Sequence, residues 1–126
     1  MDKGIVSKPS PYPVAETLDR LEAALHQKGI KVFARIDQQA EAEAVGLTLR
    51  PMQLLIFGDP RAGTPLMAAH PSLALDLPLK VLAWETDDGQ IRLNYNSPAY
   101  LKDRHGLLQE PFGPVVALIK EVLRGQ

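Results

Sequence analysis

Only two segments of the sequence have the apolar spacing of a long amphipathic helix, and they lie near its two ends. In both segments an apolar residue recurs every three or four positions, which places these residues on one face of a helix. We therefore predict helices over 13–28 and 111–123, each followed by a glycine that suits a helix end, Gly29 and Gly125. The apolar positions are Val14, Leu18, Leu21 and Leu25 in the first segment and Phe112, Val115, Val116, Ile119, Val122 and Leu123 in the second.

The rest of the sequence is divided into short segments by glycine and proline, of which the chain has 9 and 11. A continuous apolar run after Gln53 predicts a strand buried on both faces. The turn Asp87-Asp88-Gly89 predicts an antiparallel hairpin between the runs on either side of it. The predicted strands are 4–7, 30–36, 53–57, 79–85 and 90–95, and the predicted short helices are 38–45 capped by Asp37, 65–69 capped by Thr64, and 98–104 capped by Ser97.

These elements predict the α+β class, in a single domain over 1–126 with two layers. About five strands form a mixed sheet, the two long helices lie mainly on one of its faces, and the short helices are connections. Both faces of the central strands carry apolar side chains, and two helices do not cover both faces. A symmetric homodimer that buries the second face is the simplest solution. The side chains predicted on the second face are Phe33, Leu82 and Trp84, opposite to Val32, Ile36 and Val81.

The composition excludes several kinds of chemistry. The chain has no cysteine, which rules out disulfides, thiolate metal sites and a cysteine nucleophile. Its 14 basic and 15 acidic residues give a net charge of -1, which does not favour nucleic acid or an anionic membrane as a partner. No window approaches the length of an apolar membrane span, and the N-terminus does not resemble a signal peptide. We therefore expect a cytoplasmic protein.

The stretch 57–67 is the best candidate for a ligand site. A strand runs into a loop bounded by Gly58 and Gly63, and the loop runs into the helix start predicted at Thr64. Free backbone N–H groups and the positive end of the helix favour an anion there, and Arg61 adds a bidentate donor for carboxylate or phosphate. The stretch lacks the Gly-Lys-Ser/Thr ending of a phosphate-binding P-loop, so a tight turn without a ligand is the alternative.

The three histidines do not have the spacing of a helical metal pair, so we expect no metal and no cofactor. His26 lies on the polar side of the first helix, and His70 and His105 suit helix ends. An enzyme that uses Asp37, His70 or His105 as an acid or base is one alternative function.

The sequence contains the blocks Glu16-Thr17-Leu18-Asp19-Arg20-Leu21, Val32-Phe33-Ala34-Arg35-Ile36-Asp37, Leu54-Leu55-Ile56-Phe57-Gly58-Asp59-Pro60 through Gly63-Thr64-Pro65-Leu66-Met67, Ala74-Leu75-Asp76-Leu77-Pro78-Leu79-Lys80 and Tyr95-Asn96-Ser97-Pro98. In this order and spacing they resemble the prokaryotic family called domain of unknown function 302. The resemblance covers about 6–123, with Asp59 where the family often has Asn and Gln38 where it often has His. It implies a small α+β domain that is often dimeric, and it supplies no activity.

We therefore expect a dimeric binding module for a small anionic or polar ligand. A structural or protein-interaction domain without a ligand is the first alternative, and a small hydrolase-like or isomerase-like enzyme is the second. The candidate ligand-binding residues come from the glycine-bounded loop and from element ends that are expected to meet at one edge of the sheet. They are Arg35, Asp37, Gly58, Arg61, Gly63, Thr64, His70, Tyr95 and Asn96.

Overall fold

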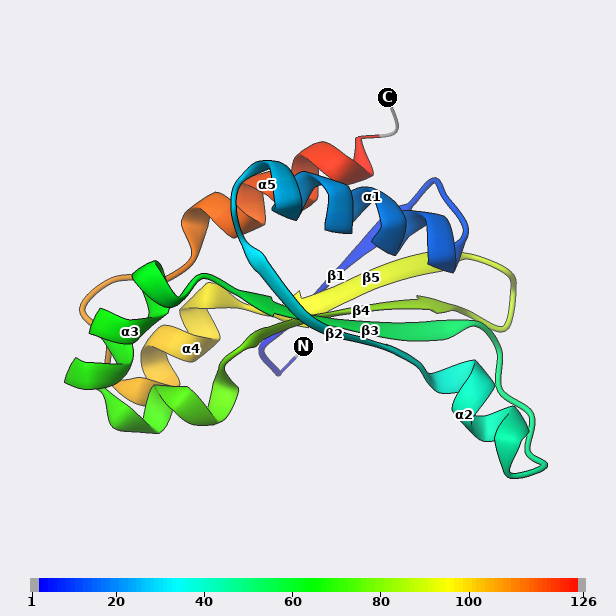
Figure 1. The fold of residues 1–126 in the computed structure, drawn as a ribbon, viewed down its shortest axis with the longest axis horizontal. Helices are drawn as coiled ribbons and strands as arrows, with labels where there is room; N and C mark the ends of the chain where they lie inside the picture. Colours follow the sequence, from blue (N-terminus) through cyan, green and yellow to red (C-terminus); the bar gives the residue numbers. More distant parts are fainter. Residues whose placement is uncertain (1–2, 125–126) are drawn as a thin grey trace.

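The computed structural model describes residues 3–124, and Figure 1 shows its fold. A sheet of five strands has the order β1-β5-β4-β3-β2, and every pair of neighbouring strands in it is antiparallel. The predicted helix end at Gly125 lies outside the described residues. In chain order the elements are β1 (Ile5–Ser10), α1 (Val14–Gln27), β2 (Lys31–Asp37), α2 (Gln38–Ala44), β3 (Met52–Gly58), α3 (Pro60–Ala69), the 3-10 helix η1 (Pro71–Asp76), β4 (Leu79–Glu85), β5 (Ile91–Asn96), α4 (Pro98–His105) and α5 (Gly113–Leu123).

The α+β class and the five strands are confirmed, whereas the prediction of a mixed sheet is wrong. Parallel pairing would require the short helices to carry the chain back across the sheet. Instead, α2 lies at one end of the sheet and α3 with η1 lies at the other (Figure 1), so the chain turns round and returns antiparallel. The long helices α1 and α5 pack beside each other on one face, as predicted.

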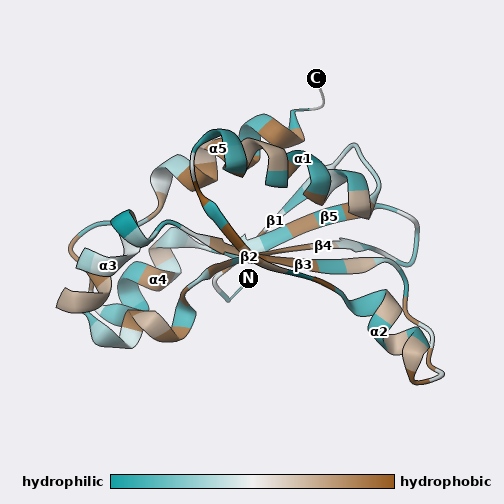
Figure 2. Cartoon of the chain, viewed as in Figure 1, coloured by the Kyte–Doolittle hydropathy of each residue, from teal (hydrophilic) through white to brown (hydrophobic). Residues whose placement is uncertain are grey.

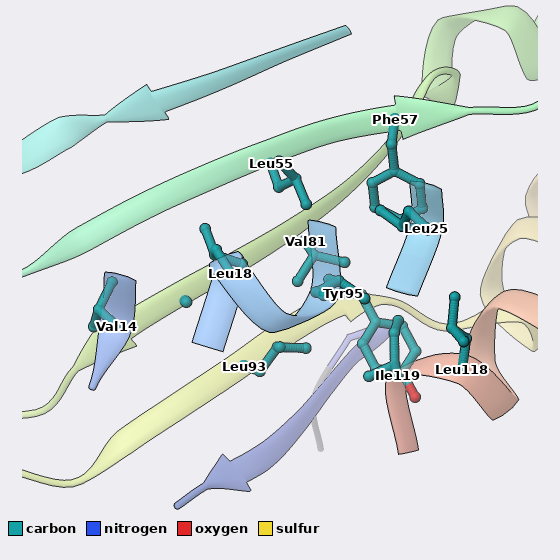
Figure 3. Close-up of a cluster of buried hydrophobic side chains, with 12 residues drawn as sticks. Val14, Leu18, Leu25, Leu55, Phe57, Val81, Leu93, Tyr95, Leu118 and Ile119 are labelled. Atoms are coloured by element: carbon teal, nitrogen blue, oxygen red, sulfur yellow. The ribbon is translucent and has the colours of Figure 1, made fainter. Parts of the chain in front are cut away.

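The core lies between this face of the sheet and the two long helices. Leu18, Leu21 and Leu25 of α1 have no exposed surface, and burying one such side chain contributes about 1.5–3 kcal/mol. Figure 2 shows hydrophobic stretches along the central strands, and Figure 3 shows the side chains of both layers meeting. The cluster consists of Val14, Leu18, Leu21, Leu25, Leu55, Phe57, Val81, Ala83, Leu93, Tyr95, Leu118 and Ile119.

A β-bulge in β2 changes which of its side chains face the helices. The register of β2 against β3 shifts between Val32 and Ala34. Val32 pairs with Phe57 and packs against the core, but Ile36 pairs with Leu54 on the opposite face. The prediction that Val32 and Ile36 share a face is therefore wrong, because one extra residue in a strand reverses its alternation.

The sheet face that points away from α1 and α5 carries apolar side chains that are only partly buried. Val81 is buried between the sheet and the helices, and side chains alternate along a strand, so Leu82 and Trp84 lie on the other face, as predicted. In β3 the residues between the buried ones are also partly exposed, so within one copy of the chain this strand is buried on one face and not on both. We call this surface the open face, and it consists of Ile36, Leu54, Ile56, Leu82 and Trp84.

The helix α3 begins at Pro60, ahead of the start that was predicted at Thr64. The sequence offers the same start signal twice, a capping residue followed by proline, and the chain uses the first. The Asp59 carboxylate accepts a hydrogen bond from the backbone N–H of Arg61 at 3.0 Å. The residues predicted as a glycine-bounded loop are therefore largely the first turns of α3, and Pro65 lies inside the helix.

The other predicted caps and the hairpin are confirmed. The Asp37 carboxylate accepts a hydrogen bond from the Ala40 N–H at 2.9 Å at the start of α2, and the Ser97 hydroxyl accepts one from the Tyr100 N–H at 3.3 Å at the start of α4. In the turn between β4 and β5, Gly89 has a φ of 84°, a conformation that favours glycine.

Candidate functional site

A cavity of about 200 Å³ lies at the end of the sheet, between the end of β3, the first turns of α3 and the start of α5. Phe33 from the bulge of β2 and Phe112 from the residue before α5 contribute aromatic rings to its wall. The wall is almost entirely apolar, and Asp59 and Thr64 supply its polar side chains. A cavity of this size and character suits a small apolar group, below the range of about 300–1,000 Å³ typical of drug-sized ligands. The other lining residues are Ile30, Phe57, Gly58, Pro60, Ala62, Gly63, Met67, Leu77, Pro78, Leu79 and Val115.

Two glycines keep this space open. A Cβ atom on Gly58 would lie 3.6 Å from the Phe33 ring and 3.8 Å from Pro78. A Cβ atom on Gly63 would lie 3.6 Å from Leu77 and 3.8 Å from Met67. These are ordinary contact distances, so a methyl group fits at either position without a clash and would occupy part of the cavity wall.

Phe112 has an unusual backbone conformation for a large side chain. Its φ of 63° and ψ of 31° lie in the left-handed region, which costs a residue other than glycine about 1–2 kcal/mol. The Phe112 ring lines the main cavity and also a hollow of about 20 Å³ beside it. Strained residues cluster at functional sites, and this one lies where the wall of the cavity is formed.

The start of α3 already holds an anion, which is its own Asp59 carboxylate. Asp59 Oδ1 accepts from the backbone N–H of Arg61 at 3.0 Å and from Arg61 Nε at 3.3 Å. The N–H groups of Ala62 and Gly63 donate to the Asp59 carbonyl at 3.0 and 2.9 Å. The backbone donors that were expected to bind an external anion therefore have partners within the chain.

A second hollow of about 430 Å³ adjoins the cavity and shares Ile30 and Asp59 with it. It runs along α5, and its other charged side chains are Lys28 and Glu121. Asp59 thus lies at the boundary between an apolar cavity and a charged hollow. The remaining lining residues are Pro114, Ala117 and Leu118.

The structure brings together only some of the predicted site residues. Gly58, Gly63 and Thr64 line the cavity, and the exposed side chain of Arg61 lies beside its mouth. Tyr95 and Asn96 line the small hollow, next to the cavity. His70 ends α3, away from the cavity lining.

Arg35 and Asp37 have structural partners in the fold. Arg35 lies on the helix face of the sheet, because the bulge reverses the alternation, and its Nη1 pairs with Asp19 at 2.7 Å and Glu22 at 3.2 Å in α1. Its Nε donates to Gln53 at 2.8 Å. Asp37 caps α2, at the other end of the sheet from the cavity.

Sequence reasoning missed a hydrogen-bonded chain that joins η1 to the end of α4. His105 Nε2 lies 2.6 Å from Asp76 Oδ2, and His105 Nδ1 lies 2.8 Å from the Ser72 hydroxyl. Arg104 Nη1 donates to both Asp76 oxygens at 3.2 Å. The His105 side chain is 2% exposed, and none of these residues lines the cavities described above. These hydrogen bonds join α4 to η1, and no local pattern in the sequence indicates them because their partners are 28–33 positions apart.

Among the residues that the structure describes, two side chains have a perturbed pKa, and neither lines the main cavity. Burial raises the pKa of the Tyr95 phenol above its usual value of 10.0. A hydrogen bond from Thr86 lowers the pKa of Asp88, in the exposed hairpin turn. Within residues 3–124, no three His, Asp or Glu side chains are grouped as a metal site requires. No helix in the same range is long and apolar enough to span a membrane.

The fold and the cavity together define a small α+β sheet protein with an apolar pocket at one end of the sheet. Residues 6–124 match the family described as "Domain of unknown function DUF302", and the chain belongs to this family. A crystal structure of an uncharacterized conserved DUF302 protein from Bacillus stearothermophilus has the same fold, with a TM-score of 0.72 at 17% identity, and the match covers 96% of this chain and 91% of that one.

Among curated proteins, the chain is 44% identical over 107 residues to "Fluoride-specific ion channel FluC 1" of Brucella suis biovar 1, a match that covers 85% of this chain and 42% of that protein. It is equally similar to the proteins named FluC 1 in Brucella abortus and FluC 2 in Brucella melitensis, of which it covers 40%. The chain therefore spans about two fifths of the length of these relatives.

Proposed function

We propose that this chain is a binding domain for a small ligand with a compact apolar body and a polar group. The observation that carries the proposal is the apolar cavity that Gly58 and Gly63 leave open between β3, α3 and α5. The polar group then lies near Asp59 and Thr64, where the lining is polar. Asp59 already accepts the hydrogen bonds of the backbone N–H groups at the start of α3, so these groups are not available to an anionic ligand. We therefore expect the ligand to bind through its shape and its apolar contacts with the cavity wall.

A ligand screen with a blocked variant tests this proposal. Benzyl alcohol, benzoate and inorganic phosphate are the probes, and thermal unfolding is the measurement, since a ligand at 100 times its Kd stabilises by about 2.7 kcal/mol. Ala62 lies exposed in the cavity lining, so Ala62→Phe obstructs the mouth without straining the core. Ala68→Phe, on an exposed part of the same helix outside the lining, is the control. The proposal expects a ring-bearing probe to stabilise the wild type and Ala68→Phe but not Ala62→Phe; equal responses in all three contradict it.

The open face supports a second candidate function, a homodimeric interaction domain. Its apolar side chains are partly exposed, and two polar atoms of the same sheet face, Trp84 Nε1 and Asn94 Oδ1, are buried without a hydrogen-bond partner among the described residues. A second copy that covers the partly exposed apolar side chains of the open face would remove them from water, which favours association. The two unpaired atoms lie beneath this surface and add to the cost of folding, at about 1–3 kcal/mol each.

Light scattering after gel filtration tests the dimer. We expect a dimer for the wild type and a monomer for Trp84→Arg, which places a charge on the open face. Leu108→Arg is the control, because Leu108 is 93% exposed and lies outside the open face. A wild-type monomer at micromolar concentration contradicts the proposal.

The names of the Brucella relatives favour a link with fluoride. The match covers 40–42% of those proteins, so we propose for this chain a ligand-binding role in the same process and not the channel activity itself. Cells that lack the chain should tolerate less fluoride, and wild type and Ala68→Phe should restore tolerance where Ala62→Phe does not. Unchanged tolerance in the deletion strain contradicts this link.

A further inference from the structure

The boundary between the cavity and the charged hollow indicates which polar group the ligand carries. Asp59 lines both spaces, so a ligand whose body fills the cavity places its polar group beside this residue. Asp59 Oδ1 is engaged twice by Arg61, whereas Asp59 Oδ2 has no hydrogen-bond partner among the described residues. The carboxylate therefore has an acceptor oxygen available for a donor on the ligand.

The charges of the side chains that line the two spaces favour a cation, and the nearby cations Arg61 and Lys31 lie outside both linings. The side chains that line the two spaces include two carboxylates, Asp59 and Glu121, against one ammonium group, Lys28. Arg61 pairs with Asp59, but its side chain is 80% exposed, so water screens most of its charge. An anionic group at the boundary would meet a carboxylate at close range, which disfavours it.

The rings at the cavity add to the same preference. Phe33 and Phe112 both line the cavity, and the faces of aromatic rings attract cations. The Lys31 ammonium group lies 5.1 Å from the centre of the Phe33 ring, which is an example of such a contact beside the cavity. An ammonium group of a ligand beside Asp59 is thus next to a cavity whose wall includes two aromatic rings.

We propose that the ligand is a small amine, in which a ring-sized apolar body fills the cavity and a protonated amino group pairs with Asp59 Oδ2. This inference rests on the ligand-binding function proposed above and adds the class of ligand. The cavity of about 200 Å³ has the volume of about seven water molecules, which limits the apolar body to roughly the size of one ring.

Three probes that differ only in the polar group test the inference: benzylamine, benzyl alcohol and benzoate. NMR titrations of the wild type should give a Kd for benzylamine about threefold to tenfold lower than for benzyl alcohol, with benzoate the weakest. Asp59→Asn should remove the difference between amine and alcohol, because asparagine keeps the helix cap and the shape but carries no charge. Arg61→Ala should enlarge the difference, because the competing cation is gone.

Asp37→Asn is the matched control, since Asp37 is the N-cap of α2 at the other end of the sheet. It should leave the amine preference unchanged. If the three probes bind equally, or benzoate binds best, the inference is wrong while the ligand-binding function stands. If none of the three perturbs the resonances of the cavity, the ligand-binding function fails for ring-sized ligands and the inference fails with it.

Discussion

Replacing Gly63 by alanine should stabilise the protein and weaken ligand binding at the same time. Gly63 lies inside α3 with a φ outside the positive range, and alanine is favoured over glycine in a helix by about 1 kcal/mol. The added methyl group has room, with its nearest neighbours at 3.6 Å in Leu77 and 3.8 Å in Met67. We therefore expect the free energy of unfolding to rise by about 0.5–1 kcal/mol, and the Tm by roughly 2–5 °C.

Urea unfolding measures this change as a higher midpoint with an unchanged slope. Gly106→Ala is the control, because Gly106 ends α4 with a φ of 66°, and a Cβ atom added there would have no neighbour within 4 Å. That variant should lose about 1 kcal/mol from backbone strain alone. A loss of stability in Gly63→Ala would show that α3 does not run through this position as described, and unchanged ligand affinity would show that Gly63 is not part of the site.

Tyr95→Phe should reduce the loss of stability above pH 10, because burial raises the pKa of the Tyr95 phenol in the folded protein and the unfolded chain therefore ionises first. Below pH 10 both states keep the proton, and urea unfolding across alkaline pH measures the difference. Arg35→Met should lower the free energy of unfolding by about 1–2 kcal/mol, less so in high salt, and leave ligand affinity unchanged, since Arg35 joins β2 to α1. His105→Ala should cost about 2 kcal/mol and expose the backbone amides of α4 to hydrogen exchange, because it leaves Ser72 and Asp76 without their shared partner.

Much of the fold could be predicted from the sequence because local signals determine it. The apolar stripes of α1 and α5, the caps at Asp37 and Ser97 and the hairpin turn at Gly89 depend on neighbouring residues only. The sequence blocks also indicated the DUF302 family, to which the chain belongs.

The predictions were wrong where contacts between residues far apart in the sequence determine the structure. No amino-acid pattern marks the bulge in β2, yet the bulge places Ile36 on the open face and Arg35 on the face that contacts α1. Two equivalent start signals precede α3, and only the fold shows that Asp59 is the cap. The cavity wall combines β2, β3, α3 and α5, so its apolar character was not visible in the segment from Gly58 to Thr64 alone.

The central claim, that the cavity binds a small apolar body, is tested most directly by NMR of the methionine methyl groups. The chain has 3 methionines; Met67 lines the cavity, and Met52 pairs with Trp84 in the sheet, away from the cavity lining. Titration with benzylamine should shift the Met67 methyl resonance of the wild type in a saturable way, leave that of Met52 in place, and have no effect on Met67 in Ala62→Phe. A shift confined to Met52, or an equal Met67 shift in Ala62→Phe, would contradict the account.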